Sequence, residues 1–349
     1  MIDAVLPSPR ATLARLSTRW LVALLLVLSW CPAGAAELAR SRAAGLQAEL
    51  QRLASNYDGE VGVYALDLRT GRAAAVNPDV GFPMASTVKV PVAVHILSLV
   101  DEGTLDLHQQ VLLKPGDIYP SMGGPIDTHL TPGSAITVRD LLHMMLTVSD
   151  NNATDILIRL GGGTAAVDAR MRALGIAGIR VDRYIWEMLA NYFGDQDASQ
   201  RRPLGPADYA VLEAADRSDE ERKRLRQLYD HDPRDTSTAA GMSALLVQVW
   251  QGRALKPETT AVLKSIMLDC RTGQGRLKGM LPDATPVAHK TGTVGNVIND
   301  VGVITLPDDK GELVVSVFQA SAQSDQARDR MIAQLARAAH DYFVFVDGE

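Results

Sequence analysis

Cysteine is nearly absent from this chain of 349 residues, which contains only Cys31 and Cys270. Two cysteines cannot form the disulfide framework of a small extracellular scaffold. The seven histidines are scattered, without an HExxH motif or a His and Cys pair at zinc-ligand spacing, so the sequence does not support a metal site. The chain also lacks a basic excess. Its net charge of −6 does not provide the basic face that binding to nucleic acid requires.

The remaining composition is that of an ordinary globular protein. Apolar residues make up 46% of the chain and charged residues 22%, which excludes a disordered or collagen-like protein. The length corresponds to one large domain or two ordinary ones.

The first 36 residues have the pattern of an export signal. Arginines precede an apolar run of about eleven residues, Trp20–Trp30, and small residues follow at Ala33–Ala36. A helix needs about 20 apolar residues to cross a bilayer, so this run is too short for a stable membrane span. We therefore expect a signal peptide over residues 1–36 and a periplasmic or secreted mature protein; a tethering helix is the alternative. Cleavage would leave Cys270, most simply a small buried thiol.

Segments rich in β-forming residues occur at both ends of the mature chain. Each end has a hairpin pattern, with turns at Arg69–Arg72 and Pro307–Gly311. Apolar residues at helical spacing flank the two hairpins. These segments predict one mixed α/β lobe whose terminal helices pack on its sheet. The predicted strands are Val61–Asp67, Ala73–Val76, Val297–Leu306 and Leu313–Ala320, and the predicted helices are Leu38–Leu53 and Gln326–Phe343.

Helical patterns dominate the middle of the chain, from about Met84 to Pro282. We expect this block to form a helical lobe inserted between the strands. The predicted helices are Val90–Val100, Val138–Thr147, Ala153–Leu160, Thr164–Leu174, Met242–Gln251 and Glu258–Leu268.

The segment Ser86-Thr87-Val88-Lys89 opens one of these helices. Ser86 and Lys89 are three residues apart, so both side chains lie on one helix face. A serine hydroxyl becomes a good nucleophile when a neighbouring group takes its proton, and a neutral lysine in a dry site can do so. The alternative is a helix-capping serine beside an unrelated lysine.

Two further motifs carry groups that could transfer a proton or bind a substrate. Ser149-Asp150-Asn151 offers a hydroxyl that can pass a proton to a leaving nitrogen and an amide that can bind a substrate; the alternative is a helix N-cap cluster. His289-Lys290-Thr291-Gly292-Thr293 follows the short β-rich segment Thr285–Ala288. A strand edge of this kind can hold a carboxylate, and Gly292 lets a ligand approach the backbone closely. Alone, the Lys-Thr-Gly tripeptide is common on protein surfaces.

The order and spacing of the three motifs resemble those of class A β-lactamases, and more broadly of the penicillin-recognising serine hydrolases. The resemblance extends from about Ala39 to Tyr342. It includes Asp232–Thr238, similar to the end of the family's Ω loop, and Arg271–Pro282, similar to the segment before the Lys-Thr-Gly strand.

The resemblance implies an α/β, β-lactamase/transpeptidase-like fold, in which an antiparallel sheet with terminal helices is joined to an all-helical lobe. The catalytic domain would cover residues 37–349. Its α/β lobe would comprise residues 37–83 and 283–349, and its helical lobe residues 84–282.

The resemblance also implies a role for each matching residue in cleaving the amide of a β-lactam. Ser86 matches the acylated nucleophile, Lys89 its proton partner and Ser149 the group that passes a proton to the lactam nitrogen. The backbone N–H groups of Ser86 and Thr293 match the oxyanion hole. We expect a monomer that needs no cofactor and takes a small-molecule β-lactam. The matching substrate-binding residues are Asn151, Lys290, Thr291, Thr293 and an auxiliary arginine, Arg276, for which a solvated surface arginine is the alternative.

The sequence departs from the family in the Ω loop. The family uses a glutamate to activate the water that hydrolyses the acyl-enzyme, and an asparagine four residues later to hold that water. Glu187 and Asn191 have this spacing, although the family pattern E-x-x-L-N is incomplete and the glutamate follows Arg183 two residues late. We predict Glu187 as the base and Asn191 as its partner; the alternative is a glutamate on an insertion helix.

Two residues match an ion pair at the neck of the family's Ω loop, Arg183 and Asp235. They are 52 positions apart in this sequence. This separation predicts an enlarged Ω loop with an insertion at about 192–231. Asp155 fits this, since it stands where most members have asparagine and a branch with enlarged loops has aspartate. A capping box at Ser218–Glu221 starts a charged helix, which we expect to be a solvated lid; partner binding is the alternative. The apolar stripe of this helix is Leu225, Leu228 and Tyr229.

Two other functions fit the same motifs. One is a related serine hydrolase or D-Ala-D-Ala peptidase acting on cell-wall peptides. Glu187 argues against it, because a peptidase need not hydrolyse a penicilloyl ester quickly. The other is a non-catalytic penicillin-binding sensor, against which an export signal without a membrane span argues. The sequence favours a serine β-lactamase with an acyl-Ser86 intermediate and water activated by Glu187.

Overall fold

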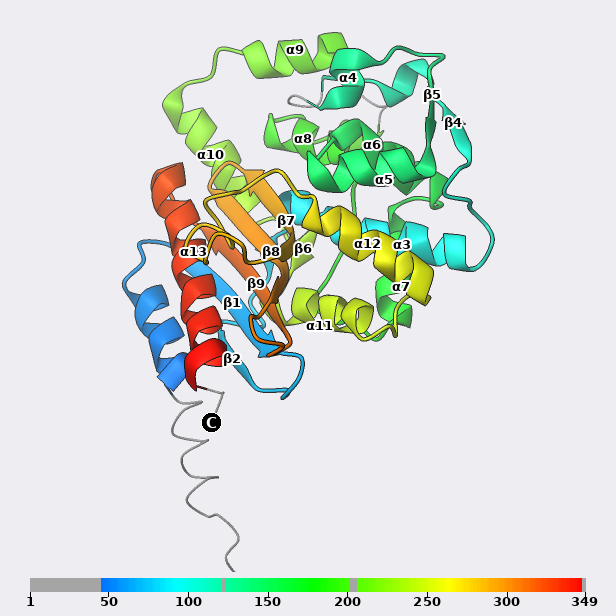
Figure 1. Ribbon diagram of the computed structural model, residues 1–349. Coiled ribbons are helices and arrows are strands. Elements are labelled where there is room, and N and C mark those ends of the chain that lie inside the picture. The colour runs from blue at the N-terminus through cyan, green and yellow to red at the C-terminus, as the bar shows by residue number, and fades with distance from the viewer. Residues whose placement is uncertain (1–44, 121–123, 201–205, 347–349) are drawn as a thin grey trace, which may run out of the picture. The chain divides into compact units, whose positions relative to one another are not determined.

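A computed structural model describes residues 45–120, 124–200 and 206–346 (Figure 1). The chain divides into two units, Met1–Arg42 and Ala43–Glu349, and all described residues belong to the second. The predicted export signal, Cys31 and the start of the predicted 38–53 helix lie outside the described residues. Within the described ranges, no helix combines the length and apolarity needed to cross a membrane.

A five-stranded antiparallel sheet organises the described unit, in the order β2-β1-β9-β8-β7. Both predicted hairpins are confirmed, and the pairing of β1 with β9 joins them into one sheet. The edge strand β7 carries the Lys-Thr-Gly motif. The strands are β1 (Glu60–Asp67), β2 (Ala73–Val76), β7 (Val287–Val294), β8 (Val297–Thr305) and β9 (Glu312–Ala320).

The terminal helices cover one face of this sheet, as predicted (Figure 1). They are the helix over residues 45–55 and α13 (Asp325–Asp341), which continues into a π-helical turn, η4 (Tyr342–Val346). Leu50 and Leu335 are fully buried in the core between these helices and the sheet. The strands β8 and β9 are buried along almost their whole length, because the second lobe covers the other face.

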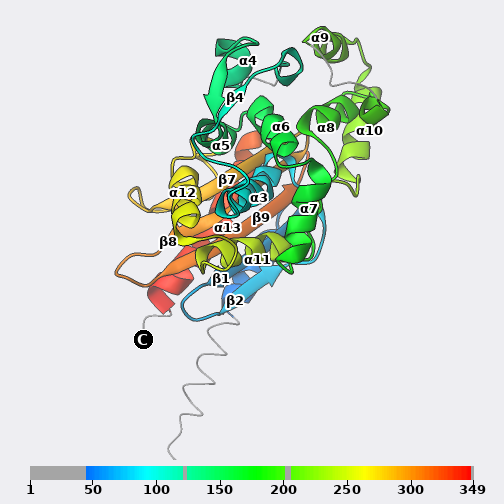
Figure 2. The ribbon, with the colours of Figure 1, turned by 90° about the vertical axis from the view of Figure 1, so that its right-hand side faces the viewer.

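The helical lobe packs on that other face (Figures 1 and 2). All six helices predicted there are confirmed, with ends shifted by three residues at most. They are α3 (Lys89–Asp101), α5 (Val138–Thr147), α6 (Asn151–Leu160), α7 (Thr164–Ala173), α11 (Ala239–Trp250) and α12 (Pro257–Leu268). The lobe also contains α4 (Pro125–His129), α8 (Ile185–Tyr192), α9 (Pro206–Ala214), α10 (Asp219–Asp230) and the 3-10 turns η1 (Ala85–Val88), η2 (Pro115–Asp117) and η3 (Ala198–Gln200).

The expectation of an all-helical lobe needs one correction, because short strands occur in it. β4 (Gln110–Leu112) pairs with β5 (Ala135–Thr137), and β6 (Thr236–Ser237) pairs with β3 (Phe82–Pro83) at the entrance to the lobe. Strands of two or three residues are too short to show an alternation of apolar and polar residues, so the sequence pattern gives no sign of them.

Helix α3 runs through the interior of this lobe. Every residue from Lys89 to Ser98 is buried, as expected for a helix surrounded by protein on all sides. Its first residue, Lys89, is therefore held in a dry environment with a fixed backbone.

Candidate active site

Ser86 lies on the 3-10 turn η1, where the chain enters α3. The predicted helix start is confirmed, but Ser86 forms no side-chain cap in this described segment, which removes the simpler alternative for the motif. The preceding Ala85 has a φ of +46°, a conformation that costs a non-glycine residue about 1–3 kcal/mol. Asn299 on β8 secures this segment, since its Nδ2 donates to the carbonyls of Pro83 at 2.9 Å and Met84 at 3.1 Å.

The Ser149-Asp150-Asn151 motif forms the link between α5 and α6. Asp150 is the N-cap of α6, and its carboxylate accepts hydrogen bonds from Ala153 N at 2.8 Å and Ile126 N at 2.9 Å. The capping alternative thus holds for Asp150 alone. Ser149 has a φ of +64°, and this turn directs the side chains of Ser149 and Asn151 toward α3.

The Lys89 ammonium group brings the first two motifs together. Its Nζ lies 3.2 Å from Ser86 Oγ and donates to Ser149 O at 2.7 Å, Ser149 Oγ at 3.0 Å and Asn151 Oδ1 at 2.6 Å. The third motif joins at the same hydroxyl, because Lys290 Nζ lies 3.0 Å from Ser149 Oγ. Ser149 therefore stands between two lysines, and all three motifs meet around one serine hydroxyl.

Burial controls the charge of both lysines, neither of which is exposed to solvent. Burial, together with the charge of Lys290, lowers the pKa of Lys89 well below its ordinary value. Burial also lowers the pKa of Lys290 to about 8. A lysine that loses its proton readily can act as a base toward a neighbouring hydroxyl.

The Lys-Thr-Gly strand passes directly over the nucleophile. A Cβ atom added to Gly292 would lie 2.6 Å from the carbonyl oxygen of Met84 and 3.2 Å from Ser86 N. Only glycine therefore allows β7 to approach η1 this closely. Thr293 on the same strand is exposed, so its side chain can meet a ligand.

Arg276 reaches the same strand from the segment between α12 and β7. It is 8% exposed, and its Nη2 donates to Thr293 Oγ1 at 2.7 Å while its Nη1 donates to Gly292 O at 3.0 Å. An ion pair with Asp329 on α13, 2.8 Å long, holds the guanidinium group from behind. The residue is therefore not a solvated surface arginine, and its guanidinium group lies against the Lys-Thr-Gly strand.

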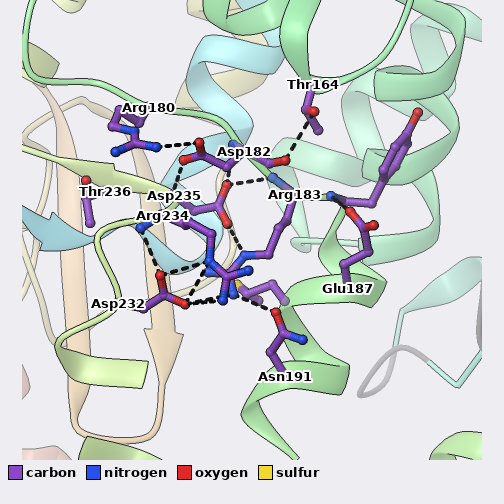
Figure 3. A network of polar contacts seen from close by, with 12 residues as sticks. Thr164, Arg180, Asp182, Arg183, Glu187, Asn191, Asp232, Arg234, Asp235 and Thr236 are labelled. Atoms are coloured by element: carbon purple, nitrogen blue, oxygen red, sulfur yellow. Dashed lines mark hydrogen bonds and ion pairs between the residues drawn. The ribbon is translucent and has the colours of Figure 1, made fainter. Parts of the chain in front are cut away.

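A polar network closes the neck of the segment between Arg183 and Asp235 (Figure 3). The predicted ion pair is present, with Arg183 Nε 2.6 Å from Asp235 Oδ2, and the Arg183 side chain is only 4% exposed. Asp232 lies 3.0 Å from Arg183 Nη1 on another side. The neck thus brings together residues 52 positions apart, and the described part of the segment between them contains α8, η3, α9 and α10.

Glu187 and Asn191 are hydrogen-bonded to residues around this neck. Glu187 Oε2 accepts a hydrogen bond from Tyr184 N at 2.8 Å, and Asn191 Oδ1 accepts one from Arg183 Nη1 at 2.8 Å (Figure 3). Among the described residues, Glu187 forms no hydrogen bond with Ser86 or Lys89. Burial raises the pKa of Glu187. The carboxylate serves as part of a capping box for α8, because Glu187 is the third residue of this helix and its side chain reaches back to the N-cap backbone.

Asp155 connects the beginning of α8 to α6. Its carboxylate accepts hydrogen bonds from Ile185 N at 2.7 Å, Trp186 N at 3.1 Å and the hydroxyl of Tyr119 at 2.5 Å. Burial raises the pKa of Asp155 to about 7, and the charge of Lys89 opposes this rise. The aspartate noted in the sequence therefore has a definite place, whereas nothing in the sequence pattern pointed to Tyr119.

Helix α10 in the predicted insertion is confirmed, and it lies beside α8 (Figure 2). Ser218 Oγ accepts a hydrogen bond from Glu221 N at 3.2 Å, the hydroxyl half of the predicted capping box. Of the predicted apolar stripe, Tyr229 is buried, but Leu228 is 51% exposed. Tyr229 contacts Tyr192 of α8 edge to face, with ring centroids 5.5 Å apart. Apart from this contact face, the helix is largely solvated.

The arrangement suits acyl transfer. It offers a half-buried serine hydroxyl, a buried lysine beside it, a second hydroxyl bonded to both lysines, and a strand whose lysine and threonines can receive an anionic group. All the predicted residues of the three motifs and Arg276 are brought together. Glu187 and Asn191 lie at the neighbouring neck instead.

Comparisons with known proteins agree with this arrangement. The beta-lactamase enzyme family matches the chain over residues 45–343. The chain is 27% identical to the β-lactamase VEB-1 of Pseudomonas aeruginosa over 309 residues, 86% of this chain and 90% of the relative. It is 30% identical to the extended-spectrum β-lactamase PER-1 of the same species, with 76% and 77% of the two chains covered. A solved structure of an ancestral class A β-lactamase is 31% identical and has a TM-score of 0.67, covering 84% of this chain and 98% of that one.

Proposed function

The chain belongs to the β-lactamase enzyme family and is a class A β-lactamase, and on this premise we propose which residues carry out its reaction. One observation carries the proposal: the hydroxyl of Ser149 lies 3.0 Å from the ammonium groups of both Lys89 and Lys290, with Ser86 Oγ 3.2 Å from Lys89. These distances support Ser86 as the nucleophile, Lys89 as its base and Ser149 as the proton shuttle.

In the acylation step, Ser86 Oγ attacks the carbonyl carbon of the lactam and neutral Lys89 takes its proton. The negative charge that develops on the carbonyl oxygen is met by the backbone N–H groups of Ser86 and Thr293. The C–N bond then breaks as Ser149 gives its proton to the lactam nitrogen, and Lys89 returns a proton to Ser149. A general base of this kind contributes about 10²–10⁴-fold to the rate.

The substrate is held by the strand on one side and the Ser149–Asn151 turn on the other. Lys290, Thr291 and Thr293 bind the carboxylate of the β-lactam, and Arg276 supports Thr293 through its hydrogen bond. Asn151 binds the amide side chain of the substrate. A charge-assisted hydrogen bond, such as one from Lys290 to the carboxylate, contributes about 1.5–3 kcal/mol.

For deacylation we propose Glu187 as the base that activates water, with Asn191 as its partner. Burial raises the pKa of Glu187, which suits proton transfer near neutral pH, and its helix α8 packs against α6. Its carboxylate must leave Tyr184 N to do this. Asp155 is the second candidate, because its charge interacts with Lys89 and burial raises its pKa to about 7.

The segment between Arg183 and Asp235 we propose to be an enlarged Ω loop, closed by their ion pair. We also propose that residues 1–36 direct export to the periplasm or medium and are then removed. The mass of the protein recovered from a periplasmic extract tests this, since a chain that keeps residues 1–36 would contradict it.

Turnover of nitrocefin, combined with intact-mass detection of the acyl-enzyme, tests the assignments. Ser86→Ala should abolish both labelling by a penicillin and turnover; labelling that survives at another residue would remove Ser86 from its role. Glu187→Gln should still form the acyl-enzyme but accumulate it, whereas Glu220→Gln and Glu221→Gln should behave like the wild type. If Asp155→Asn accumulates the acyl-enzyme and Glu187→Gln does not, the base is Asp155.

A further inference from the structure

The buried side chain of Tyr119 joins two parts of the site that the proposed reaction uses in different steps. Tyr119 follows the 3-10 turn η2 and is 2% exposed. Its hydroxyl donates to Asp155 Oδ2 at 2.5 Å and lies 3.3 Å from the carbonyl oxygen of Asn151. Both acceptors belong to α6. One hydroxyl is therefore close to the carboxylate that holds α8 and to a residue that contacts Lys89.

The backbone of Tyr119 is fixed to the same helix. Its N–H donates to Asn152 Oδ1 and its carbonyl oxygen accepts from Asn152 Nδ2, both at 3.1 Å. Asn152 is completely buried. Because Asn152 and Asp155 are three residues apart, they lie on one face of α6. Tyr119 is thus bound to this face at its main chain and at its hydroxyl, which fixes where the hydroxyl points.

The Asp155 carboxylate connects this unit to the start of α8. Its Oδ1 accepts from Ile185 N at 2.7 Å, and its Oδ2 accepts from Trp186 N at 3.1 Å as well as from Tyr119. Ile185 and Trp186 are the first two residues of α8, and N–H groups at a helix start have no acceptor within their own helix. Of these three donors, the hydroxyl of Tyr119 is the one that does not belong to α8. It can therefore orient the carboxylate independently of the helix that the carboxylate holds.

The place of α8 matters for the second half of the reaction. Glu187 is the third residue of this helix, so a displacement of its first turn would move Glu187 as well. The proposed activation of water requires the Glu187 carboxylate to leave Tyr184 N. The backbone of α8 must keep its position beside α6 while this side chain moves. The contact that holds the first turn of α8 to α6 is the Asp155 carboxylate.

We propose that Tyr119 is a positioning residue for hydrolysis of the acyl-enzyme: its hydroxyl holds the Asp155 carboxylate in the orientation that fixes the start of α8, and with it Glu187. The inference rests on the proposed role of Glu187. Acylation depends on groups that are held by other contacts, since Ser149 accepts two hydrogen bonds from Lys89 Nζ. Tyr119 therefore acts mainly on the second half of the reaction.

The test measures the two halves of the reaction separately in Tyr119→Phe, a variant that removes one oxygen atom and keeps the ring. Time-resolved intact mass after mixing with a penicillin gives the rate at which the acyl-enzyme forms. Its decay after removal of the free penicillin gives the rate of hydrolysis. We expect hydrolysis to slow by about 10- to 100-fold, because misplacement of a reacting group by about 1 Å can cost 10²-fold. Formation of the acyl-enzyme should stay within about threefold of the wild type, because the interactions that it uses are kept.

A double variant shows whether Tyr119 acts through Asp155. Residues that act as one unit have non-additive effects, so adding Tyr119→Phe to Asp155→Asn should slow hydrolysis by less than about threefold. A merely structural loss would add its full factor in both backgrounds.

Tyr342→Phe is the matched control for the loss of a buried hydroxyl. Tyr342 is 8% exposed and lies in η4, in the core on the other face of the sheet. This variant should leave both rates unchanged.

Three results would overturn the inference: hydrolysis at the wild-type rate in Tyr119→Phe, an equal slowing of both steps, or a full additional loss in the Asp155→Asn background. Glu187→Gln, measured alongside, separates this inference from the proposed function. If Glu187→Gln hydrolyses its acyl-enzyme like the wild type, the proposed role of Glu187 fails and the inference fails with it. A stalled Glu187→Gln beside a normal Tyr119→Phe would refute the inference alone.

Discussion

Gly292→Ala is the sharpest test of the geometry around the nucleophile. The added Cβ would lie 2.6 Å from the carbonyl oxygen of Met84 and 3.2 Å from Ser86 N, whereas ordinary contacts of a Cβ are 3.4–4 Å. Both neighbours are backbone atoms, and Asn299 holds the carbonyl of Met84 in place. The strand must therefore move away from η1 by close to 1 Å, and a misplacement of about 1 Å can cost 10²-fold in rate.

We expect two measurable consequences of Gly292→Ala. The backbone N–H groups of Ser86 and Thr293 would no longer be correctly spaced, and loss of one oxyanion-hole donor costs about 10²–10³-fold in kcat. Overpacking of this kind also lowers the free energy of unfolding by about 1–3 kcal/mol. Nitrocefin kinetics and urea unfolding measure the two effects, at a temperature where circular dichroism shows the variant to be folded.

Gly116→Ala is the control for this experiment, because its Cβ would meet no atom within 4 Å and its φ is not positive. It should change neither quantity appreciably. If Gly292→Ala kept kcat/KM within threefold of the wild type, the close approach of β7 to η1 would not be what aligns the oxyanion hole, and the reasoning above would be refuted.

Three further outcomes follow from the same contacts. Lys290→Ala should lower kcat/KM by about 10- to 100-fold, the equivalent of one charge-assisted hydrogen bond of about 1.5–3 kcal/mol, and Arg276→Ala should do so to a similar or smaller extent; an unchanged value for Arg276→Ala would remove that residue from the site. Asp150→Ala should lower the free energy of unfolding by about 2–4 kcal/mol in urea, because it removes the cap of α6 and leaves Ile126 N unpaired. For Asp155, burial raises the folded-state pKa to about 7, above the ordinary value of 3.8, so the folded state binds this proton more tightly. Relative to Asp155→Asn, the wild type should lose stability as the pH rises from about 4 to about 7, and a constant difference across that range would contradict the assignment.

The sequence by itself determined the main strands and helices and the type of reaction. Runs of β-forming residues beside turn signals marked the strands around Val61–Asp67 and Leu313–Ala320, and helical spacing marked helices such as Val138–Thr147, whose bounds agree with those of α5. These patterns are local, so a few consecutive residues suffice to read them. The three short motifs and their order were enough for the resemblance to class A β-lactamases, because each motif must keep fixed residue types at fixed spacing to do its chemistry.

Only the tertiary structure decided which groups meet. Nothing in the sequence indicated that Ser149 Oγ stands between Lys89 and Lys290, or that the hydroxyl of Tyr119 lies against Asp155, since these contacts join elements far apart in the chain. The same limit explains Glu187: its spacing to Asn191 agreed with the family pattern, yet the start of α8 is set by Asp155, which binds Ile185 N and Trp186 N from another helix. A hydrogen bond from a distant element thereby fixes the register of α8 in space, and this register directs the Glu187 carboxylate to Tyr184 N. Spacing along the chain specifies which residues share a helix face, but packing between helices specifies where that face points.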